Sequence, residues 1–228
     1  MIIVGVNTST RRGSVALVSN GEVADEADSD SPESFSRTIL VMIEDIISRN
    51  HGMLEDVEGF GIAVGPGSFT GIRIGLATLS GICLSRNIPV FGVSTLEAMA
   101  LSSGYSGDGV LAPMLDAGQE NVYYGLFKKN GDGIERLSPD SVGVIDEIIS
   151  ETGNSILAFG EGAEVYRKNL EKAGVKVVED TYLFSTSAGV ALLAEKMGVA
   201  KAESDIFRIR PNYMHRSSIN YFPLILED

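Results

Sequence analysis

The order of apolar and turn-forming segments in the first hundred residues limits the fold of this chain more than any other feature. Two short strands and a third that follows Asn20-Gly21, the dipeptide preferred in tight hairpin turns, predict an antiparallel meander. Helical and strand-like segments then alternate, which is typical of an α/β layer. In order, we expect strands at 2–7, 14–19 and 22–27, a helix at 34–49, a strand at 60–64, a helix at 71–86, a strand at 90–93 and a helix after Ser94.

The second half repeats this order in a looser form. We expect a meander of strands at 110–116, 121–128 and 134–137, in which Asn130-Gly131 forms the hairpin turn. A helix near Ile145 and an alternation of strand, helix, strand and helix at 156–159, 165–170, 175–178 and 188–197 complete it. This is the order of the ribonuclease-H-like core that is duplicated in actin and hexokinase. We therefore predict two lobes, residues 1–103 and 104–228.

Charge and hydropathy limit the function classes. A net charge of −13 repels a polyphosphate backbone unless basic residues cluster locally, so we expect the chain alone to bind nucleic acid poorly. No apolar run approaches the length that spans a bilayer, and the first residues carry no basic leader, so we expect a cytoplasmic protein with no membrane partner. Cys83 is the single cysteine, and its apolar surroundings predict a buried thiol.

A glycine-rich elbow joins the strand at 60–64 to the following helix. Such an elbow lets helical amides face an anion, and in a kinase-like fold the loop after the first strand would face the same phosphates. The candidate anion-binding residues are Thr8, Ser9, Thr10, Gly65, Gly67, Ser68 and Thr70. The elbow has neither the Walker ending nor the dinucleotide-binding spacing. A tight turn with Ser68 or Thr70 as the helix N-cap explains the elbow equally well.

The sequence offers no credible catalytic or metal constellation. Kinases of this fold place an acid at the position of Asn7, and a neutral amide is a weaker ligand for a hard cation. His51 and His215 are far apart, and no serine stands in a nucleophile elbow. We therefore predict no catalytic residues, no metal site and no cofactor.

The helix at 71–86 is apolar around much of its circumference. It carries no charge from Ile74 to Ser85, and small residues recur at four-residue spacing, Gly71 with Gly75 and Ala77 with Gly81. A helix of this kind must be covered on several sides. Either a partner covers it, or it packs in the ordinary way with the helix at 34–49.

The stretch 207–216 gathers basic and aromatic residues in an otherwise acidic chain. It is suited to contact RNA or an acidic partner, or to dock on its own domain.

The string Gly65-Pro66-Gly67-Ser68-Phe69-Thr70-Gly71-Ile72-Arg73-Ile74-Gly75 resembles the signature of the TsaB family, also called YeaZ. Further matching segments occur at 7–10, 14–17, 92–100, 116–117, 122–125 and 210–214, so the resemblance spans nearly the whole chain. It implies an actin-like ATPase (ASKHA) fold and a part in forming N6-threonylcarbamoyladenosine beside the tRNA anticodon.

The resemblance also implies a role and partners. TsaB proteins are taken to be non-catalytic: they bind the catalytic TsaD subunit together with the ATPase TsaE, touch tRNA only through the complex, and form homodimers in isolation. The first two helices pair with TsaD, which implies interface residues Phe35, Ile39, Met42, Ile43, Gly71, Ile74, Gly75, Thr78, Leu79 and Ile82.

This chain departs from the family pattern in two places. Asn7 replaces the usual aspartate, and Phe35-Ser36 stands where a histidine is common. Both departures weaken a claim of nucleotide or metal chemistry and leave docking untouched. The competing hypotheses are an ATPase or phosphotransferase of the same fold and a glycoprotease-type peptidase.

Overall fold

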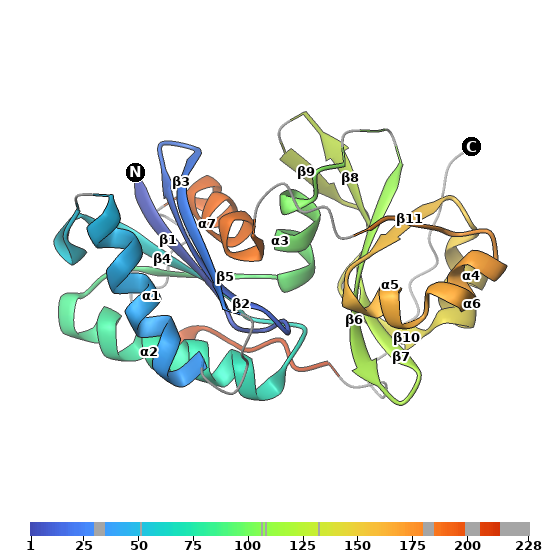
Figure 1. Cartoon of the computed structure of the whole chain (residues 1–228), viewed down its shortest axis with the longest axis horizontal. Helices are drawn as coiled ribbons and strands as arrows, with labels where there is room; N and C mark the ends of the chain where they lie inside the picture. The colour runs from blue at the N-terminus through green and yellow to red at the C-terminus, as the bar shows by residue number, and fades with distance from the viewer. Residues whose placement is uncertain are drawn as a thin grey trace. The chain divides into compact units, whose positions relative to one another are not determined.

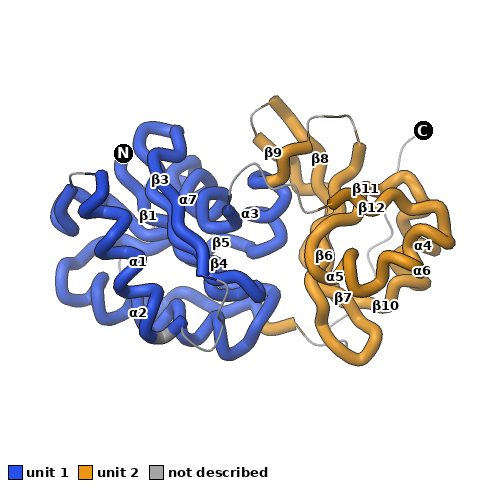
Figure 2. Tube along the Cα trace, in the orientation of Figure 1, with its two compact units in different colours: residues 1–102, 182–212 blue, residues 103–181, 213–228 orange. Residues whose placement is uncertain are grey.

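The chain forms two compact units in this computed structural model, which describes residues 1–29, 35–50, 52–105, 107, 109–131, 133–179, 185–198 and 206–214. Unit 1 comprises 1–102 with 182–212, and unit 2 comprises 103–181 with 213–228 (Figure 2). The grouping differs from two consecutive lobes because the late segment 182–212 belongs to unit 1.

Unit 1 contains a mixed sheet with the strand order β3-β2-β1-β4-β5. β1 pairs antiparallel with β2 and parallel with β4, and β4 pairs parallel with β5. The parallel strands therefore end at one edge, here called the carboxyl edge. The elements are β1 (Ile2–Asn7), β2 (Gly13–Ser19), β3 (Glu22–Ser29), α1 (Phe35–Arg49), η2 (Leu54–Asp56), β4 (Gly59–Ala63), α2 (Phe69–Arg86), β5 (Val90–Val93), α3 (Thr95–Ser102), α7 (Thr186–Met197) and η4 (Ile206–Arg208).

The predicted hairpin between β2 and β3 is confirmed. Asn20 and Gly21 have φ values of 52° and 82°, the left-handed pair that a two-residue turn of this type needs. β3 is polar and half-exposed along its length because it is the last strand of the sheet.

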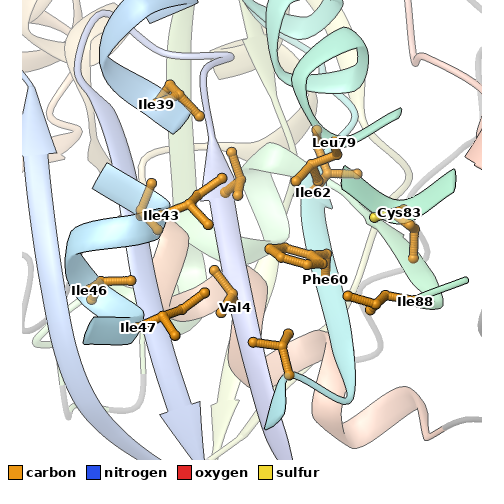
Figure 3. Close-up of a cluster of buried hydrophobic side chains, with 14 of the residues drawn as sticks. Val4, Ile39, Ile43, Ile46, Ile47, Phe60, Ile62, Leu79, Cys83 and Ile88 are labelled. Carbon is orange, nitrogen blue, oxygen red and sulfur yellow. The ribbon is translucent and has the colours of Figure 1, made fainter. Parts of the chain in front are cut away.

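Helices cover both faces of this sheet (Figure 1). α1 and α2 lie on one face, where Ile43, Phe60 and Leu79 belong to one buried cluster (Figure 3). α3 and α7 cover the other face, where Ile3, Phe91 and Val190 belong to a second cluster. The buried Cys83 thiol lies in the first cluster, and burial raises its pKa to about 12, so it is an inert core group as expected.

α7 approaches the sheet closely because glycines leave room for it. A Cβ atom on Gly5 would overlap the carbonyl oxygen of Ser187, and one on Gly61 would lie 2.9 Å from a methyl carbon of Val190. Gly189 of α7 likewise has no space for a side chain beside the Ala98 carbonyl of α3. The backbone contact explains why a helix that follows unit 2 in sequence packs in unit 1.

Unit 2 repeats the strand order of unit 1. Its main path is β10-β7-β6-β11-β12, with β8 pairing with β6 and β9. The antiparallel and parallel pairings correspond to those of β3-β2-β1-β4-β5, so the predicted duplication is confirmed. The elements are β6 (Val110–Gly118), β7 (Asn121–Tyr124), β8 (Phe127–Asn130), β9 (Gly133–Arg136), β10 (Ser141–Val144), α4 (Ile145–Thr152), β11 (Ile156–Phe159), α5 (Glu161–Val165), α6 (Arg167–Lys172) and β12 (Lys176–Val177).

Three details of the predicted second half are wrong. The segment 121–128 is two strands, because β7 pairs with the later residues of β6 while β8 pairs with its first residues. The third strand of the repeated meander is β10, not 134–137, and the Asn130-Gly131 turn closes the additional hairpin β8–β9. The helix expected at 165–170 is α5 and α6, which meet at Tyr166.

Candidate functional site

The loop after β1 lies at the carboxyl edge of unit 1 and is buried from Asn7 to Ser9. The Asn7 Oδ1 atom accepts hydrogen bonds from the Ser9 amide (3.1 Å) and the Ser9 hydroxyl (2.6 Å). The Asn7 Nδ2 atom donates to Thr10 Oγ1 (2.8 Å) and to the Arg12 carbonyl (3.3 Å). Asn7 therefore organises the loop with both its donor and its acceptor.

The elbow before α2 is built directly onto this loop. The Thr8 hydroxyl donates to the Gly71 carbonyl (2.7 Å), and the Ser68 amide donates to the Ser9 carbonyl (2.7 Å). Ser68 is the N-cap of α2, since its hydroxyl accepts from the Gly71 amide (3.1 Å). A Cβ atom on Gly67 or Gly71 would overlap the loop carbonyls, so close contact between loop and elbow depends on these glycines.

Most residues of the predicted anion site already take part in contacts within the loop and the elbow. Thr8, Ser9, Gly67, Ser68 and Gly71 already use their polar groups or their space within the elbow. Thr10 donates its hydroxyl to the Arg12 carbonyl (2.7 Å), Thr70 is exposed, and Gly65 is buried beside the Asn212 backbone. The alternative of a capped, tight elbow is confirmed, and anion binding stays a prediction. Within the described residues, no group of three or more His, Cys, Asp or Glu side chains is placed to hold a metal ion.

We predict that Asn7→Asp lowers the free energy of unfolding by about 1 to 3 kcal/mol at pH 7. A carboxylate keeps the acceptor for Ser9 but cannot donate to the Arg12 carbonyl, which it would instead repel. Urea unfolding measures the loss. Asn169→Asp, the same change on the exposed surface of α6, is the control and should alter stability by less than about 0.5 kcal/mol. Equal stability of the two variants would contradict this account of Asn7.

The residues expected at a partner interface lie in two environments. The side chains of Phe35, Ile39, Ile43 and Leu79 are buried in the core of unit 1, and Gly71 and Gly75 face the Thr8 loop. Met42, Ile74, Thr78 and Ile82 are half-buried. The structure thus shows that ordinary packing of α2 beside α1 accounts for much of its apolar circumference.

An apolar surface remains on the outer side of these two helices. Val41 of α1 is 51% exposed and Leu84 of α2 is 55% exposed. Leu40, Ala77 and Gly81 are also exposed, and a Cβ atom on Gly81 would meet nothing within 4 Å. We call Leu40, Val41, Ala77, Gly81 and Leu84 the outer helical face. The residues that the resemblance implied for an interface are mostly core-facing instead. The sequence signal for the outer helical face was that α2 carries more apolar residues than one buried face needs.

None of the helices in the described part of the chain combines the length and the apolarity that crossing a bilayer requires.

Comparison with protein-family models matches residues 29–212 to the family described as "TsaD: tRNA N6-adenosine threonylcarbamoyltransferase". The chain is 32% identical over 152 residues to the tRNA threonylcarbamoyladenosine biosynthesis protein TsaB of Escherichia coli, a match that covers 66% of this chain and 65% of that protein. It is 28% identical over 174 residues to the TsaB protein of Bacillus subtilis, covering 75% and 76% of the two chains.

Solved structures agree with the fold. YeaZ from Pseudomonas aeruginosa superimposes with a TM-score of 0.78 at 20% identity, covering 93% of this chain and 99% of that one. An activator of 2-hydroxyisocaproyl-CoA dehydratase from Clostridium difficile is more distant, with a TM-score of 0.54 at 9% identity, covering 86% and 95%. The duplicated sheet order and these likenesses identify the actin-like ATPase fold. By its family match, the chain belongs to the TsaD family of proteins and, within it, to the TsaB (YeaZ) group.

Proposed function

We propose that this chain is a non-catalytic subunit required for N6-threonylcarbamoyladenosine formation on tRNA in the cytoplasm. In this proposal it binds and supports the catalytic TsaD subunit, together with the ATPase TsaE. The relatives that carry the TsaB name are described as biosynthesis proteins of this modification, and the family model is that of the transferase. In this proposal TsaD catalyses the transfer reaction, and this chain supplies a surface to which TsaD binds.

The observation that carries the docking role is the outer helical face. Val41 of α1 and Leu84 of α2 are exposed aliphatic side chains, and α2 also exposes the small residues Ala77 and Gly81. Small residues let a second helix approach closely. α2 carries no charge between Arg73 and Arg86, so a partner helix would desolvate no ion there. When TsaD is absent, the same face would pair two copies of this chain.

The hydrogen bonds of the β1 loop support the non-catalytic part of the proposal. A phosphate or a metal would need groups that now bond to one another, and Asn7 supplies an amide where a carboxylate would hold a cation. The competing hypothesis, an ATPase, requires ATP turnover by the isolated chain that Thr8→Val abolishes. No observation here favours the peptidase hypothesis.

The docking role is tested by size-exclusion chromatography of the purified chain with TsaD at micromolar concentration. We expect the wild-type chain to co-elute, and Val41→Glu or Leu84→Glu to weaken the complex by roughly 30-fold or more, because a charge would be buried without a partner. The same variants should shift the isolated chain from dimer toward monomer.

Val165→Glu is the matched control, since Val165 of α5 is 60% exposed and lies in unit 2. It should bind TsaD as the wild type does. A wild-type chain that fails to co-elute, or three variants with equal affinity, would refute the docking surface.

A further inference from the structure

The segment 206–212 is a fixed part of unit 1. Ile206 is buried in the cluster beneath α2, and a methyl carbon of Ile209 lies 3.4 Å from where a Cβ atom of Gly92 would stand. The Asn212 amide donates to the Val64 carbonyl (2.7 Å), and the Asn212 carbonyl lies 2.7 Å from the Cβ position of Gly65. The segment therefore runs along the last residues of β5 and β4, at the carboxyl edge.

This segment turns its basic and aromatic side chains outward. Arg208 and Arg210 are exposed, and Phe207 is 67% exposed. Ile206 is buried in the core cluster, and Ile209 is half-buried against it. Among the residues that the structure describes, no ion pair joins Arg208 or Arg210 to an acid. The described part of the stretch 207–216, which is 207–214, thus contains both anchoring residues and exposed ones.

Further cations stand at the same edge. Arg11 and Arg12 are exposed in the loop after β1, which contacts the elbow through Ser9 and Gly67. Arg73 follows the first turn of α2, and its guanidinium lies 3.6 Å from the centre of the Phe69 ring. We call Arg11, Arg12, Arg73, Phe207, Arg208 and Arg210 the basic edge.

Acids lie at both edges of unit 1. At the carboxyl edge Asp28 pairs with Ser14 of β2, and Glu97 stands in the first turn of α3. Other acids lie at the opposite edge. Glu58 precedes β4 and accepts a hydrogen bond from the Ile2 amide (2.7 Å), and Glu195 lies 3.9 Å from the amino group of Met1. Bases there are paired, as Arg86 is with Glu55 and Arg49 with Asp25. The exposed arginines of the basic edge are a local concentration of positive charge, which can attract an anion although the whole chain carries −13.

We propose that the basic edge contacts the sugar–phosphate backbone of RNA. Guanidinium groups match phosphate oxygens as two-pronged donors, and exposed aromatic rings beside them provide stacking surfaces for unpaired bases. An acidic peptide would also match the arginines, but the exposed ring of Phe207 beside them favours RNA, whose unpaired bases stack on such rings. The identification of the RNA as tRNA rests on the proposed function. The inference that the ligand is a polyanion rests on the exposed arginines of the basic edge.

The test compares two double charge reversals in the complex of the full chain with TsaD, using fluorescently labelled tRNA over a salt series. One variant is Arg208→Glu with Arg210→Glu. The control is Lys168→Glu with Lys172→Glu on the exposed surface of α6, which changes the net charge equally. We expect the arginine variant to bind tRNA about tenfold more weakly, and the slope of log affinity against log salt to be shallower by about 1.4 to 1.8.

Both variants should melt as the wild type does. Equal tRNA affinity of the arginine variant and the wild type, or an equal loss in both double variants, would overturn the proposal. If the arginine variant loses TsaD while the isolated chain keeps its tRNA affinity, the edge is a protein-binding surface and the RNA proposal fails. If the wild type does not bind TsaD, the proposed function fails, and titration of the isolated chain with tRNA still tests the basic edge.

Discussion

Gly71→Ala should lower the free energy of unfolding by about 3 kcal/mol or more, because the new methyl group would overlap the Thr8 carbonyl oxygen. The obstacle is backbone, and it is held by the Thr8 hydroxyl and by the buried loop around it, so it cannot turn aside as a flexible side chain would. Chemical denaturation of the purified variant measures the loss. We also expect α2 to shift outward at its first turn, which weakens any docking on the outer helical face.

Gly81→Ala is the matched control in the same helix. Its Cβ atom would meet nothing within 4 Å, so the substitution should raise stability by about 0.5 to 1 kcal/mol through helix propensity alone. The two variants make the same chemical change, but their effects on the free energy of unfolding should have opposite signs. If both lose or both gain stability by the same amount, the close contact between elbow and loop is not what Gly71 provides.

Phe60→Ala should cost about 3 to 5 kcal/mol of stability. The Phe60 side chain is fully buried on β4, between the core residues of α1 and those of α2 (Figure 3). Its removal leaves a cavity that the rigid strand cannot close, and both helices lose their shared support. Calorimetry or denaturant titration measures the loss, and we expect looser packing of α1 to appear as faster amide exchange.

Phe207→Ala makes the same truncation on the exposed basic edge. Stability should change by less than about 1 kcal/mol, while affinity for RNA should fall. A loss of stability as large as that of Phe60→Ala would mean that Phe207 serves the core, and a small loss for Phe60→Ala would contradict its place in it.

Local signals in the sequence were enough to predict the first half of the fold. The short apolar runs in 2–7 and 14–19 coincide with β1 and β2, the turn at Asn20-Gly21 coincides with the hairpin, and the helical spacing after Phe35 coincides with α1. Each of these depends on interactions between near neighbours, which is why pattern sufficed. The carboxyl-edge elbow was predicted as one of two alternatives, with Ser68 or Thr70 as the cap, and the structure shows that the cap is Ser68.

Local signals were not enough to predict the strand pairing of the second half. Asn130-Gly131 is a good turn signal, but β8 and β9 form an additional hairpin that local pattern does not distinguish from the repeated meander. Which strand lies beside β7 is decided by long-range pairing with Ser141–Val144, a short segment with little signal of its own. The place of α7 in unit 1 depends on Gly5, Gly61 and Gly189, whose role appears only when the backbones meet.

The candidate surface was predicted in part. The family resemblance implied an interface on the first two helices, and three of the residues named for it, Phe35, Ile39 and Leu79, are in the core. Val41 and Leu84 were not named for it, and they are apolar residues that solvent reaches. The basic edge joins residues near positions 11, 73 and 208, which only the three-dimensional structure brings to one edge.

The late position of α7 bears on how the protein is made. The ribosome synthesises the five strands of the first sheet well before residues 186–197. The face of β1 and β4 that α7 covers therefore stays uncovered while β6 to β12 are synthesised. Unit 1 can therefore finish folding only after the chain of unit 2 has largely emerged. This order links the maturation of the two units in time, although each has its own core.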